Sequence, residues 1–231
     1  TLSLKYQHFS TLIQALTGFK TARSDDLLSQ TIKMCYIIDR QSQILSGGMI
    51  MKVATIGTSF ITEWFLSAAA KIDNAEPIAV YSRNEQKGRD LASQYGIQKV
   101  YTDLDTMLKD DEIECVYVAS PNSLHYSHAS AALNAGKHVI CEKPFTSTTK
   151  ELKELSELAK SKHLFLFEAI VTIHMPNYIS LKEKLPELGD IKMVQCNFSQ
   201  YSSRYDKFMA GEPVNVFDPK FSGGALMDIN I

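Results

Sequence analysis

The sequence predicts an α/β protein built on a doubly wound parallel sheet, and three observations support this prediction. From residue 52 onward, short apolar runs alternate with segments whose apolar residues recur at helical spacing, which is typical of parallel strands joined by crossover helices. Small or polar residues follow several of these runs, at the strand ends where such sheets bind ligands. Six runs fall within about 120 residues, which is the size expected of one doubly wound domain.

The apolar runs define the predicted elements in chain order. The predicted strands are residues 53–56, 77–81, 100–101, 114–119, 138–141 and 164–167. The predicted helices between and after them cover 61–69, 85–95, 127–135 and a segment that begins at a capping box formed by Thr148 and Glu151. After residue 169 the pattern changes: a helix over 177–185 precedes a long alternating segment, 191–201, which predicts a strand of an antiparallel or mixed sheet.

These changes of pattern divide the chain into three parts. Residues 1–48 predict a pair of helices that ends at Gly47 and Gly48. Residues 49–169 form the doubly wound domain, and residues 170–231 open a second α/β domain. We expect the second domain to be truncated, because only one long strand pattern follows residue 169.

Composition and charge exclude several classes of protein. The 231 residues carry 24 Lys and Arg against 26 Asp and Glu, so the net charge of −2 provides no positive field for a nucleic acid. The sequence has neither an apolar run long enough to span a membrane nor a basic and apolar leader, which predicts a cytoplasmic protein without a membrane partner. Its four cysteines lack C-x-x-C spacing, and three of them sit in apolar surroundings, which favours buried free thiols over a disulfide or a metal site: Cys35, Cys115, Cys141 and Cys196.

The turn after the first predicted strand partly matches a dinucleotide fingerprint. It reads Gly57-Thr58-Ser59-Phe60-Ile61-Thr62, where the fingerprint has glycine at the first and third positions and glycine or alanine at the sixth. Gly57 keeps the tight turn, while Ser59 and Thr62 replace the other two small residues. Hydroxyl groups beside a helix N-terminus still favour an anion. The alternative is a strand-to-helix turn without a ligand.

The end of the second predicted strand indicates which dinucleotide binds. A carboxylate that reads the ribose of NAD is expected about 20 residues after the glycine turn, but the chain has Ser82 and Arg83 there. A guanidinium and a hydroxyl suit a 2′-phosphate, which favours NADP over NAD. If Arg83 is merely a solvated loop charge, the choice of cofactor stays open.

A third feature is Glu142-Lys143-Pro144 at the end of the fifth predicted strand. A lysine at this edge can donate a hydrogen bond to a substrate oxygen, and it can move a proton if partial burial lowers its pKa. Pro144 makes the turn rigid. An ordinary surface lysine is the alternative when the tripeptide is considered alone.

Three longer stretches, one of which contains this tripeptide, resemble a known family. Residues 119–125, 135–144 and 223–228 read ASPNSLH, AGKHVICEKP and GGALMD, and they resemble the glucose-fructose oxidoreductase and inositol dehydrogenase family, Gfo/Idh/MocA. Residues 52–231 match that family in order. The resemblance implies a nicotinamide-binding Rossmann domain, a second α/β domain with a large open sheet, and hydride transfer to or from a sugar, polyol or related alcohol.

The resemblance also implies roles for individual residues. Lys143 would be the catalytic or substrate-orienting lysine, supported by Asp228, and the peptide bond before Pro144 would be cis. Asn122 and His125 would flank the nicotinamide end of the site. The expected cofactor-binding residues are Gly57, Thr58, Ser59, Phe60, Ile61, Ser82, Arg83, Ser120, Pro121, Asn122, His125, Glu142 and Lys143.

Phe167-Glu168-Ala169, followed by Pro176, resembles the branch of dihydrodiol and NADP-dependent xylose dehydrogenases. The Trp and Arg that this branch usually has between those landmarks are absent, so the substrate within the branch is not defined. His174 lies in this interval and is a candidate proton donor, with a packing histidine as the alternative.

Two departures from the family affect the functional hypothesis. The acid/base histidine that many members carry four residues after the position of Asp228 would fall at 232, and most of the second sheet, through which members pair, is missing. The helices of residues 1–46 are similar to those that normally end family members, which suggests a rearranged or fragmentary chain; an unrelated extension is the alternative. We therefore expect an NADP-dependent oxidoreductase that acts on a small molecule, with NAD as the alternative cofactor. A homo-oligomer that pairs through the second sheet, as in the family, is one possible assembly, and a monomer is the other. A truncated, non-catalytic dinucleotide-binding module is the alternative, and a methyltransferase fits less well.

Overall fold

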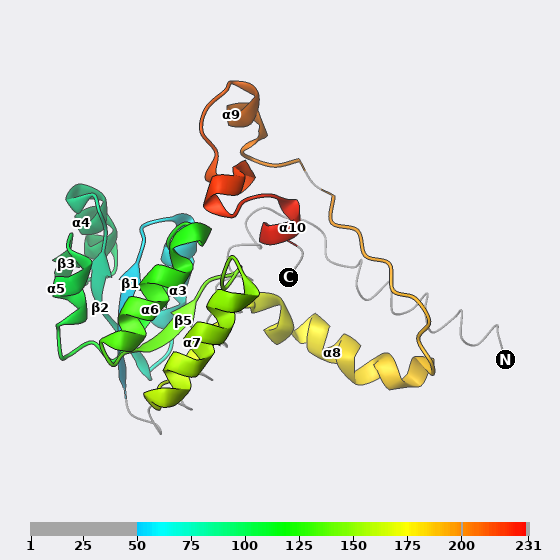
Figure 1. The fold of residues 1–231 in the computed structure, drawn as a ribbon, viewed down its shortest axis with the longest axis horizontal. Coiled ribbons are helices and arrows are strands. Elements are labelled where there is room, and N and C mark those ends of the chain that lie inside the picture. Colours follow the sequence, from blue (N-terminus) through cyan, green and yellow to red (C-terminus); the bar gives the residue numbers. More distant parts are fainter. Residues whose placement is uncertain (1–49, 200, 230–231) are drawn as a thin grey trace.

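The computed structural model describes residues 50–199 and 201–229, and its centre is a parallel sheet of six strands (Figure 1). The strands are β1 (Met51–Ile56), β2 (Ala75–Tyr81), β3 (Lys99–Tyr101), β4 (Cys115–Val118), β5 (His138–Cys141) and β6 (Leu166–Glu168). Their order is β3-β2-β1-β4-β5-β6. The predicted doubly wound parallel sheet is therefore confirmed. The helix pair expected for residues 1–48, which includes Cys35, lies outside the described residues.

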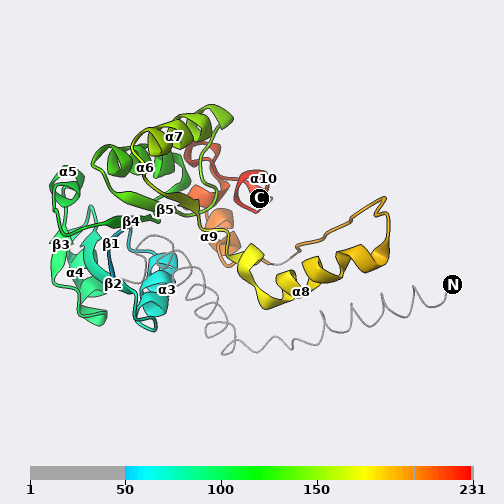
Figure 2. The same cartoon turned by 90° about the horizontal axis from the view of Figure 1, so that it is seen from below.

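Helices cover both faces of the sheet. The helices that follow its strands are α3 (Phe60–Ala69), α4 (Glu85–Gln94), α5 (Leu104–Leu108), α6 (His125–Asn134) and α7 (Thr149–Ser161). Helices α3 and α4 contribute to one buried cluster, while α5, α6 and α7 contribute to the other. Figure 2 shows the first pair on one side of the strands and α6 and α7 on the other.

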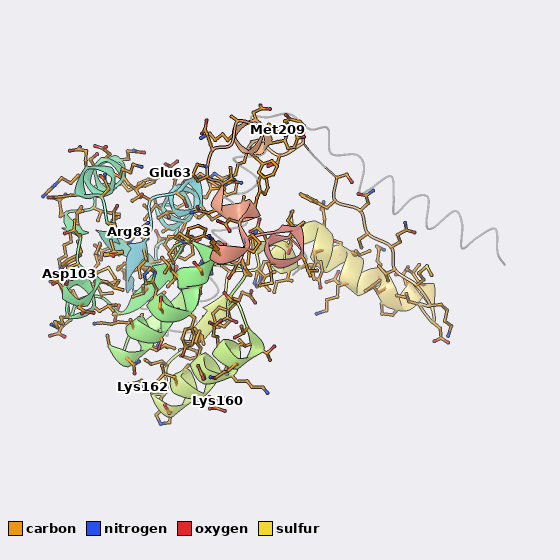
Figure 3. The ribbon with its side chains drawn as sticks, turned by 45° about the horizontal axis from the view of Figure 1, so that its top comes forward. Glu63, Arg83, Asp103, Lys160, Lys162 and Met209 are labelled. Atoms are coloured by element: carbon orange, nitrogen blue, oxygen red, sulfur yellow. The ribbon has the colours of Figure 1, made fainter. Side chains whose placement is uncertain are left out.

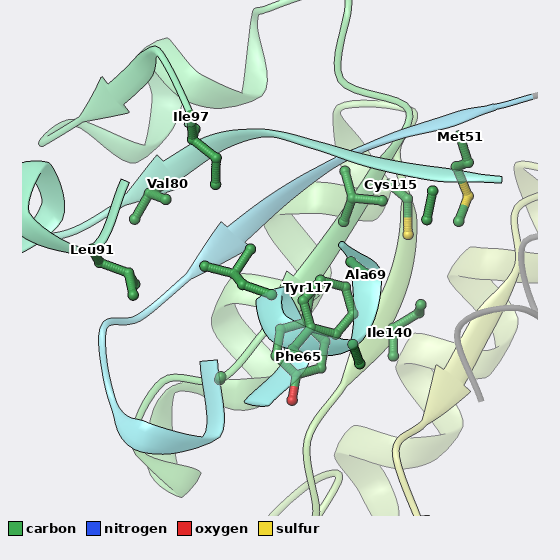
Figure 4. Close-up of a cluster of buried hydrophobic side chains, with 14 of the residues drawn as sticks. Met51, Phe65, Ala69, Val80, Leu91, Ile97, Cys115, Tyr117 and Ile140 are labelled. Carbon is green, nitrogen blue, oxygen red and sulfur yellow. The ribbon is translucent and has the colours of Figure 1, made fainter. Parts of the chain in front are cut away.

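Alternating residues of the central strands supply both clusters, which explains why these strands are continuous apolar runs. In β4, Cys115 and Tyr117 belong to the cluster under α3, and Val116 and Val118 belong to the opposite one. The ring of Tyr117 stacks on Phe65 of α3 with ring centroids 3.9 Å apart (Figure 4). Cys115 and Cys141 are buried free thiols, as predicted, and burial raises the pKa of the Cys115 thiol to about 12. Cys196 is free but exposed, contrary to the expected burial.

Most predicted helices and strands are present, and their ends differ from the predicted ends by one or two residues. The capping box of α7 is present, since the Thr148 hydroxyl accepts from the Glu151 amide and the Glu151 carboxylate accepts from the Thr148 amide. Helix α5 was not predicted. It has five residues, too few to show helical periodicity, and begins where the Asp103 carboxylate accepts from the Thr106 amide at 2.8 Å.

The region after β6 contains short helical elements. They are the 3₁₀ helix η2 (Val171–His174), α8 (Pro176–Lys184), η3 (Leu185–Leu188), α9 (Tyr205–Met209), η4 (Asn215–Phe217), η5 (Pro219–Phe221) and α10 (Ala225–Asp228). None of the helices in the described ranges is long and apolar enough to cross a membrane.

The strand predicted for residues 191–201 is wrong. Residues 191–199 form no strand, and their apolar side chains are exposed, including Met193 at 83%, Val194 at 76% and Phe198 at 67%. An alternating sequence becomes a strand only when a neighbouring strand accepts its backbone hydrogen bonds. Within the described part of the chain, no strand lies beside this segment.

Candidate functional site

A cleft of about 1160 Å³ lies at the carboxyl edge of the sheet. Its walls come from the loops after β1, β2, β4 and β5 and from residues 203–228, and α9 and α10 lie at this end of the sheet in Figure 1. The chain reverses its winding direction between β1 and β4, and parallel sheets bind ligands at such a switch point. The volume exceeds the roughly 300–1,000 Å³ of ordinary small-molecule pockets, so an extended ligand fits.

Gly57 forms the floor of the cleft, and the structure requires a glycine there. Its φ is +115°, and an added Cβ would lie 2.6 Å from the carbonyl oxygen of Ala119 at the end of β4. The Gly57 amide donates to the carbonyl of Tyr81 at the end of β2. The turn is thus fixed between both neighbours of β1, and its backbone is open toward the cleft.

The two missing glycines of the fingerprint have structural replacements. Ser59 precedes α3 in an extended conformation with φ −86°, so its backbone does not need glycine, and its side chain makes no capping hydrogen bond. Thr62 is fully buried, with Oγ1 3.5 Å from the position of a Cβ on Gly57, and this oxygen has no hydrogen-bond partner among the described residues. The first amides of α3, at Phe60 and Ile61, have no helical acceptor and can bind an anion.

The loop after β2 presents two basic side chains to the cleft. The buried Ser82 hydroxyl accepts from the Asn84 amide at 3.2 Å, and the Asn84 side chain caps α4 by accepting from the Lys87 amide at 3.0 Å. This arrangement leaves Arg83 exposed at the rim, where Figure 3 labels it, and places Lys87 in the first turn of α4; both line the cleft. Sequence reasoning missed Lys87, although a cation near the positive end of a helix is a usable signal for an anion.

Lys143 and Asp228 meet across the cleft. The Lys143 ammonium donates to the Asp228 backbone carbonyl at 2.7 Å and to its carboxylate at 3.3 Å. Both side chains keep partial access to solvent, at 36% and 26%. Two glycines precede α10: a Cβ on Gly223 would lie 2.6 Å from a backbone oxygen of Asn215, and Gly224 has φ +110°. The glycine pair therefore permits the chain path that brings Asp228 to the lysine.

Glu142 is buried directly behind this lysine. Tyr117 donates its hydroxyl to Oε1 of Glu142, and the Lys143 amide donates to Oε2 at 3.3 Å. Burial raises the pKa of Glu142 to about 6 even though both donors oppose the rise, and burial together with Glu142 raises the pKa of Tyr117 well above its usual value. The carboxyl group therefore fixes the backbone of Lys143 while it stays almost completely buried.

His125 holds together the loops that follow β4 and β5. Its ring nitrogens lie 2.9 Å from the Ser120 carbonyl and 2.7 Å from the Pro144 carbonyl, and the peptide bond between Lys143 and Pro144 is cis. Burial lowers the pKa of His125, and the hydrogen bonds to the two backbone carbonyls oppose this shift. Asn122 donates to the Ser222 carbonyl at 3.2 Å, which links the loop to the glycine pair.

Every residue predicted for cofactor binding lines the cleft, and so does Asp228. The structure does not bring His174 to it: this residue ends η2 and is absent from the lining. Sequence reasoning also missed His128, whose Nδ1 lies 3.0 Å from the Ser120 hydroxyl, and the basic residues Arg204 and Lys207. The three-residue spacing from His125 could have indicated His128, whereas no sequence pattern connects the other two to this edge.

Strand order, glycine turn and switch-point cleft define a Rossmann-fold protein of the dinucleotide-binding class. Comparison with family models agrees, because the model described as "Oxidoreductase family, NAD-binding Rossmann fold" matches residues 51–170. The chain belongs to this family, Gfo/Idh/MocA.

Similar proteins come from several organisms. The chain is 41% identical to the scyllo-inositol 2-dehydrogenase (NADP(+)) IolU of Bacillus subtilis, over 79% of this chain and 56% of that protein. It is 30% identical to the trans-1,2-dihydrobenzene-1,2-diol dehydrogenase of Sus scrofa, over 79% and 53%. The chain spans about half the length of these curated relatives. Among solved structures, the 3-ketoreductase KijD10 of Actinomadura kijaniata in complex with NADP matches with a TM-score of 0.57 and 29% identity, over 60% of this chain and 44% of that one.

Proposed function

We propose that the protein binds NADP(H) in the cleft and belongs to an oxidoreductase that transfers a hydride between nicotinamide and a hydroxyl-bearing carbon. The observation that carries this proposal is the contact of Lys143 with Asp228 beside the switch-point turn. It places an ammonium group, held by a carboxylate, at the edge of the sheet where the dinucleotide would lie. The turn after β1 supports the fit of the cofactor, because Gly57, Thr58 and Ser59 line the cleft beside the free amides at the start of α3.

The residues around the cleft divide the work of binding. The amides of Phe60 and Ile61 would hold the diphosphate, and Arg83 with Lys87 would hold a 2′-phosphate through charge-assisted hydrogen bonds. Asn122 would lie near the nicotinamide end, next to Lys143. The cofactor supplies the hydride chemistry when bound.

Lys143 would hold the reacting substrate oxygen and donate or accept its proton. Asp228 orients the ammonium group, while Glu142 and His125 fix the backbone on which it stands. His174 does not line the cleft, which favours the interpretation of a packing histidine over that of a proton donor.

The relatives support a substrate class rather than one substrate. Their names refer to scyllo-inositol, dihydrobenzenediol and D-xylose, and two of those names specify NADP. We propose a sugar, polyol or dihydrodiol-type alcohol for this protein. The division at residues 48 and 169, pairing of subunits through the second domain, and a cytoplasmic location remain predictions from the sequence.

The decisive experiment compares Lys143→Ala with the unchanged chain. NADPH binding is measured by fluorescence titration, and turnover is screened with scyllo-inositol, D-xylose and a dihydrodiol. We expect the variant to bind NADPH within about twofold of the parent and to lose about 10²- to 10⁴-fold in kcat, the usual contribution of a general acid or base. Lys160→Ala, an exposed lysine of α7, is the matched control. A Lys143→Ala variant with full activity, or a parent chain that does not bind NADPH, contradicts the proposal.

A further inference from the structure

Part of the wall of the cleft comes from the segment that contains α9. Ser203, Arg204 and Lys207 line the cleft together with the turn between β1 and α3. Arg204 and Lys207 are three positions apart across the start of a helix, so their side chains lie on one face. Figure 3 shows α9, which carries Met209, near α3, which carries Glu63.

Arg204 reaches the first residue of α3. Its guanidinium carbon lies 5.8 Å from the centroid of the Phe60 ring, in the range of a cation–π contact. The Phe60 side chain is 48% exposed. A guanidinium placed over an aromatic face keeps its N–H groups free along its edge, so it can donate to a second group in the cleft.

The charge around this contact is unbalanced. Within the described ranges, neither Arg204 nor Lys207 forms an ion pair, and the nearby Asp206 carboxylate instead accepts a hydrogen bond from Tyr201. The positive end of the α3 dipole faces the same space. Two cations and the positive end of a helix around one cleft repel one another. An anion bound between them would be attracted by all three and would offset this repulsion.

We propose that Arg204, assisted by Lys207, binds the diphosphate of the dinucleotide together with the Gly57 turn. This inference rests on the proposed function and deepens it. A planar guanidinium fork matches two phosphate oxygens, and the Phe60 ring holds the fork in place. Cofactor binding would thus draw residues from both the Rossmann domain and the region after residue 200.

The position of Arg204 separates this role from recognition of the 2′-phosphate. Arg204 contacts the start of α3, which follows β1, whereas Arg83 and Lys87 follow β2. In this class of fold the diphosphate lies at the first of these turns and the ribose at the second. Arg204 should therefore affect any ligand that contains a diphosphate, whether or not the ligand carries a 2′-phosphate.

The test is a titration of three ligands with Arg204→Ala and Arg204→Gln. We expect both variants to bind NADPH and 2′-phospho-ADP-ribose about tenfold more weakly than the parent, the loss expected for one charge-assisted hydrogen-bonding group. Binding of adenosine 2′-monophosphate, which lacks the diphosphate, should change by less than about twofold. Lys220→Ala removes an exposed lysine of the same segment outside the cleft lining and should leave all three affinities unchanged.

The outcomes separate the two proposals. If the parent chain binds NADPH and both Arg204 variants bind it equally well, the diphosphate role is wrong and the proposed function stands. Equal weakening for all three ligands also overturns the role, because Arg204 would then support the cleft in general. A parent chain that binds none of the three ligands overturns the proposed function and this inference with it. Circular dichroism of each variant verifies that it is folded.

Discussion

Glu142 shows how a single buried group can hold a catalytic candidate in place. Its two oxygens accept from the Tyr117 hydroxyl and from the Lys143 amide, so the carboxyl group joins the middle of β4 to the end of β5. Burial raises its pKa to about 6 from the ordinary 4.5. Because the ionised carboxylate is buried, it lowers the stability of the fold at neutral pH. The same carboxylate holds the backbone of Lys143 in place.

The raised pKa of Glu142 predicts a specific dependence of stability on pH. Between about pH 4.5 and 6 the folded protein retains a proton that the unfolded chain has lost, so the contribution of this group falls as the pH rises. Above pH 6, where Glu142 is ionised, this group makes the free energy of unfolding about 2 kcal/mol lower than it is below pH 4.5, where the group is protonated. Urea unfolding at several pH values should show that Glu142→Gln removes this slope from the free energy of unfolding.

The exposed Glu157 of α7 provides the control, since Glu157→Gln should leave the pH profile of the parent unchanged. An identical slope for Glu142→Gln and the parent between pH 4.5 and 6 would show that the Glu142 carboxyl group does not titrate there.

Arg83 gives a second prediction, on cofactor choice. Arg83→Ala should weaken NADPH binding by about 10- to 100-fold, because a charge-assisted contact to the 2′-phosphate is lost. Binding of NADH, which lacks that phosphate, should change little. Fluorescence titration of both cofactors measures the ratio, and Arg89→Ala, which removes an arginine of α4 paired with Glu85, is the control. An unchanged ratio would remove Arg83 from the recognition of the phosphate.

Most of the candidate site could be predicted at this scale. Residues of the loops after strands were identified because strand ends meet at one edge, and the family motif added Lys143 and Asp228. Arg204 could not be predicted, because its place beside Phe60 depends on the path of the chain between separate segments. Such proximity is a tertiary property that local patterns do not encode.

At the scale of elements, α7 tests how much a cap contributes. Thr148→Ala removes the hydroxyl that accepts from the Glu151 amide and should lower the free energy of unfolding by about 1 kcal/mol. Each of the two side chains accepts a hydrogen bond from the backbone amide of the other residue. The double variant with Glu151→Ala should therefore lose less free energy of unfolding than the sum of the losses in the two single variants. Urea unfolding measures each value, with Lys153→Ala on the exposed face as control. Strict additivity would show that the two halves of the box act independently.

The elements also show where sequence patterns succeed. Strands buried on both faces gave continuous apolar runs, and the amphipathic helices between them gave clear periodicity, so β1 to β6 were all anticipated. The pattern over residues 191–201 failed because alternation records which side chains prefer burial, while a strand also needs a partner. Helix α5 was too short for periodicity, and its Asp103 cap was the only local signal.

At the scale of the whole molecule, the region after residue 200 is joined to the Rossmann domain by polar contacts and lines the cleft together with it. Ser222 contacts both Asn122 and the Ser147 hydroxyl, and Asp228 contacts Lys143. Because residues of both regions line the cleft, a ligand bound there would contact both. Cofactor binding and the stability of the whole described structure should therefore be coupled.

This coupling predicts stabilisation by ligand. NADPH at 100 times its Kd should raise the free energy of unfolding by about 2.7 kcal/mol, since it binds only the folded state. NADH at the same concentration should stabilise less if the 2′-phosphate contributes affinity. Thermal unfolding with each cofactor measures the shift, and equal shifts would contradict the preference for NADP(H).

The central position of β1 also affects how the protein folds. Val53 pairs with Pro77 on one side and with Cys115 on the other, so the middle of the sheet joins stretches that are distant along the chain. No hairpin can start such a sheet, and the entropy of closing a long loop must be overcome before β4 docks. During synthesis on a ribosome, one edge of β1 therefore has no hydrogen-bonded neighbour until β4 has left the ribosome. We expect the nascent chain to be most prone to aggregation in this interval.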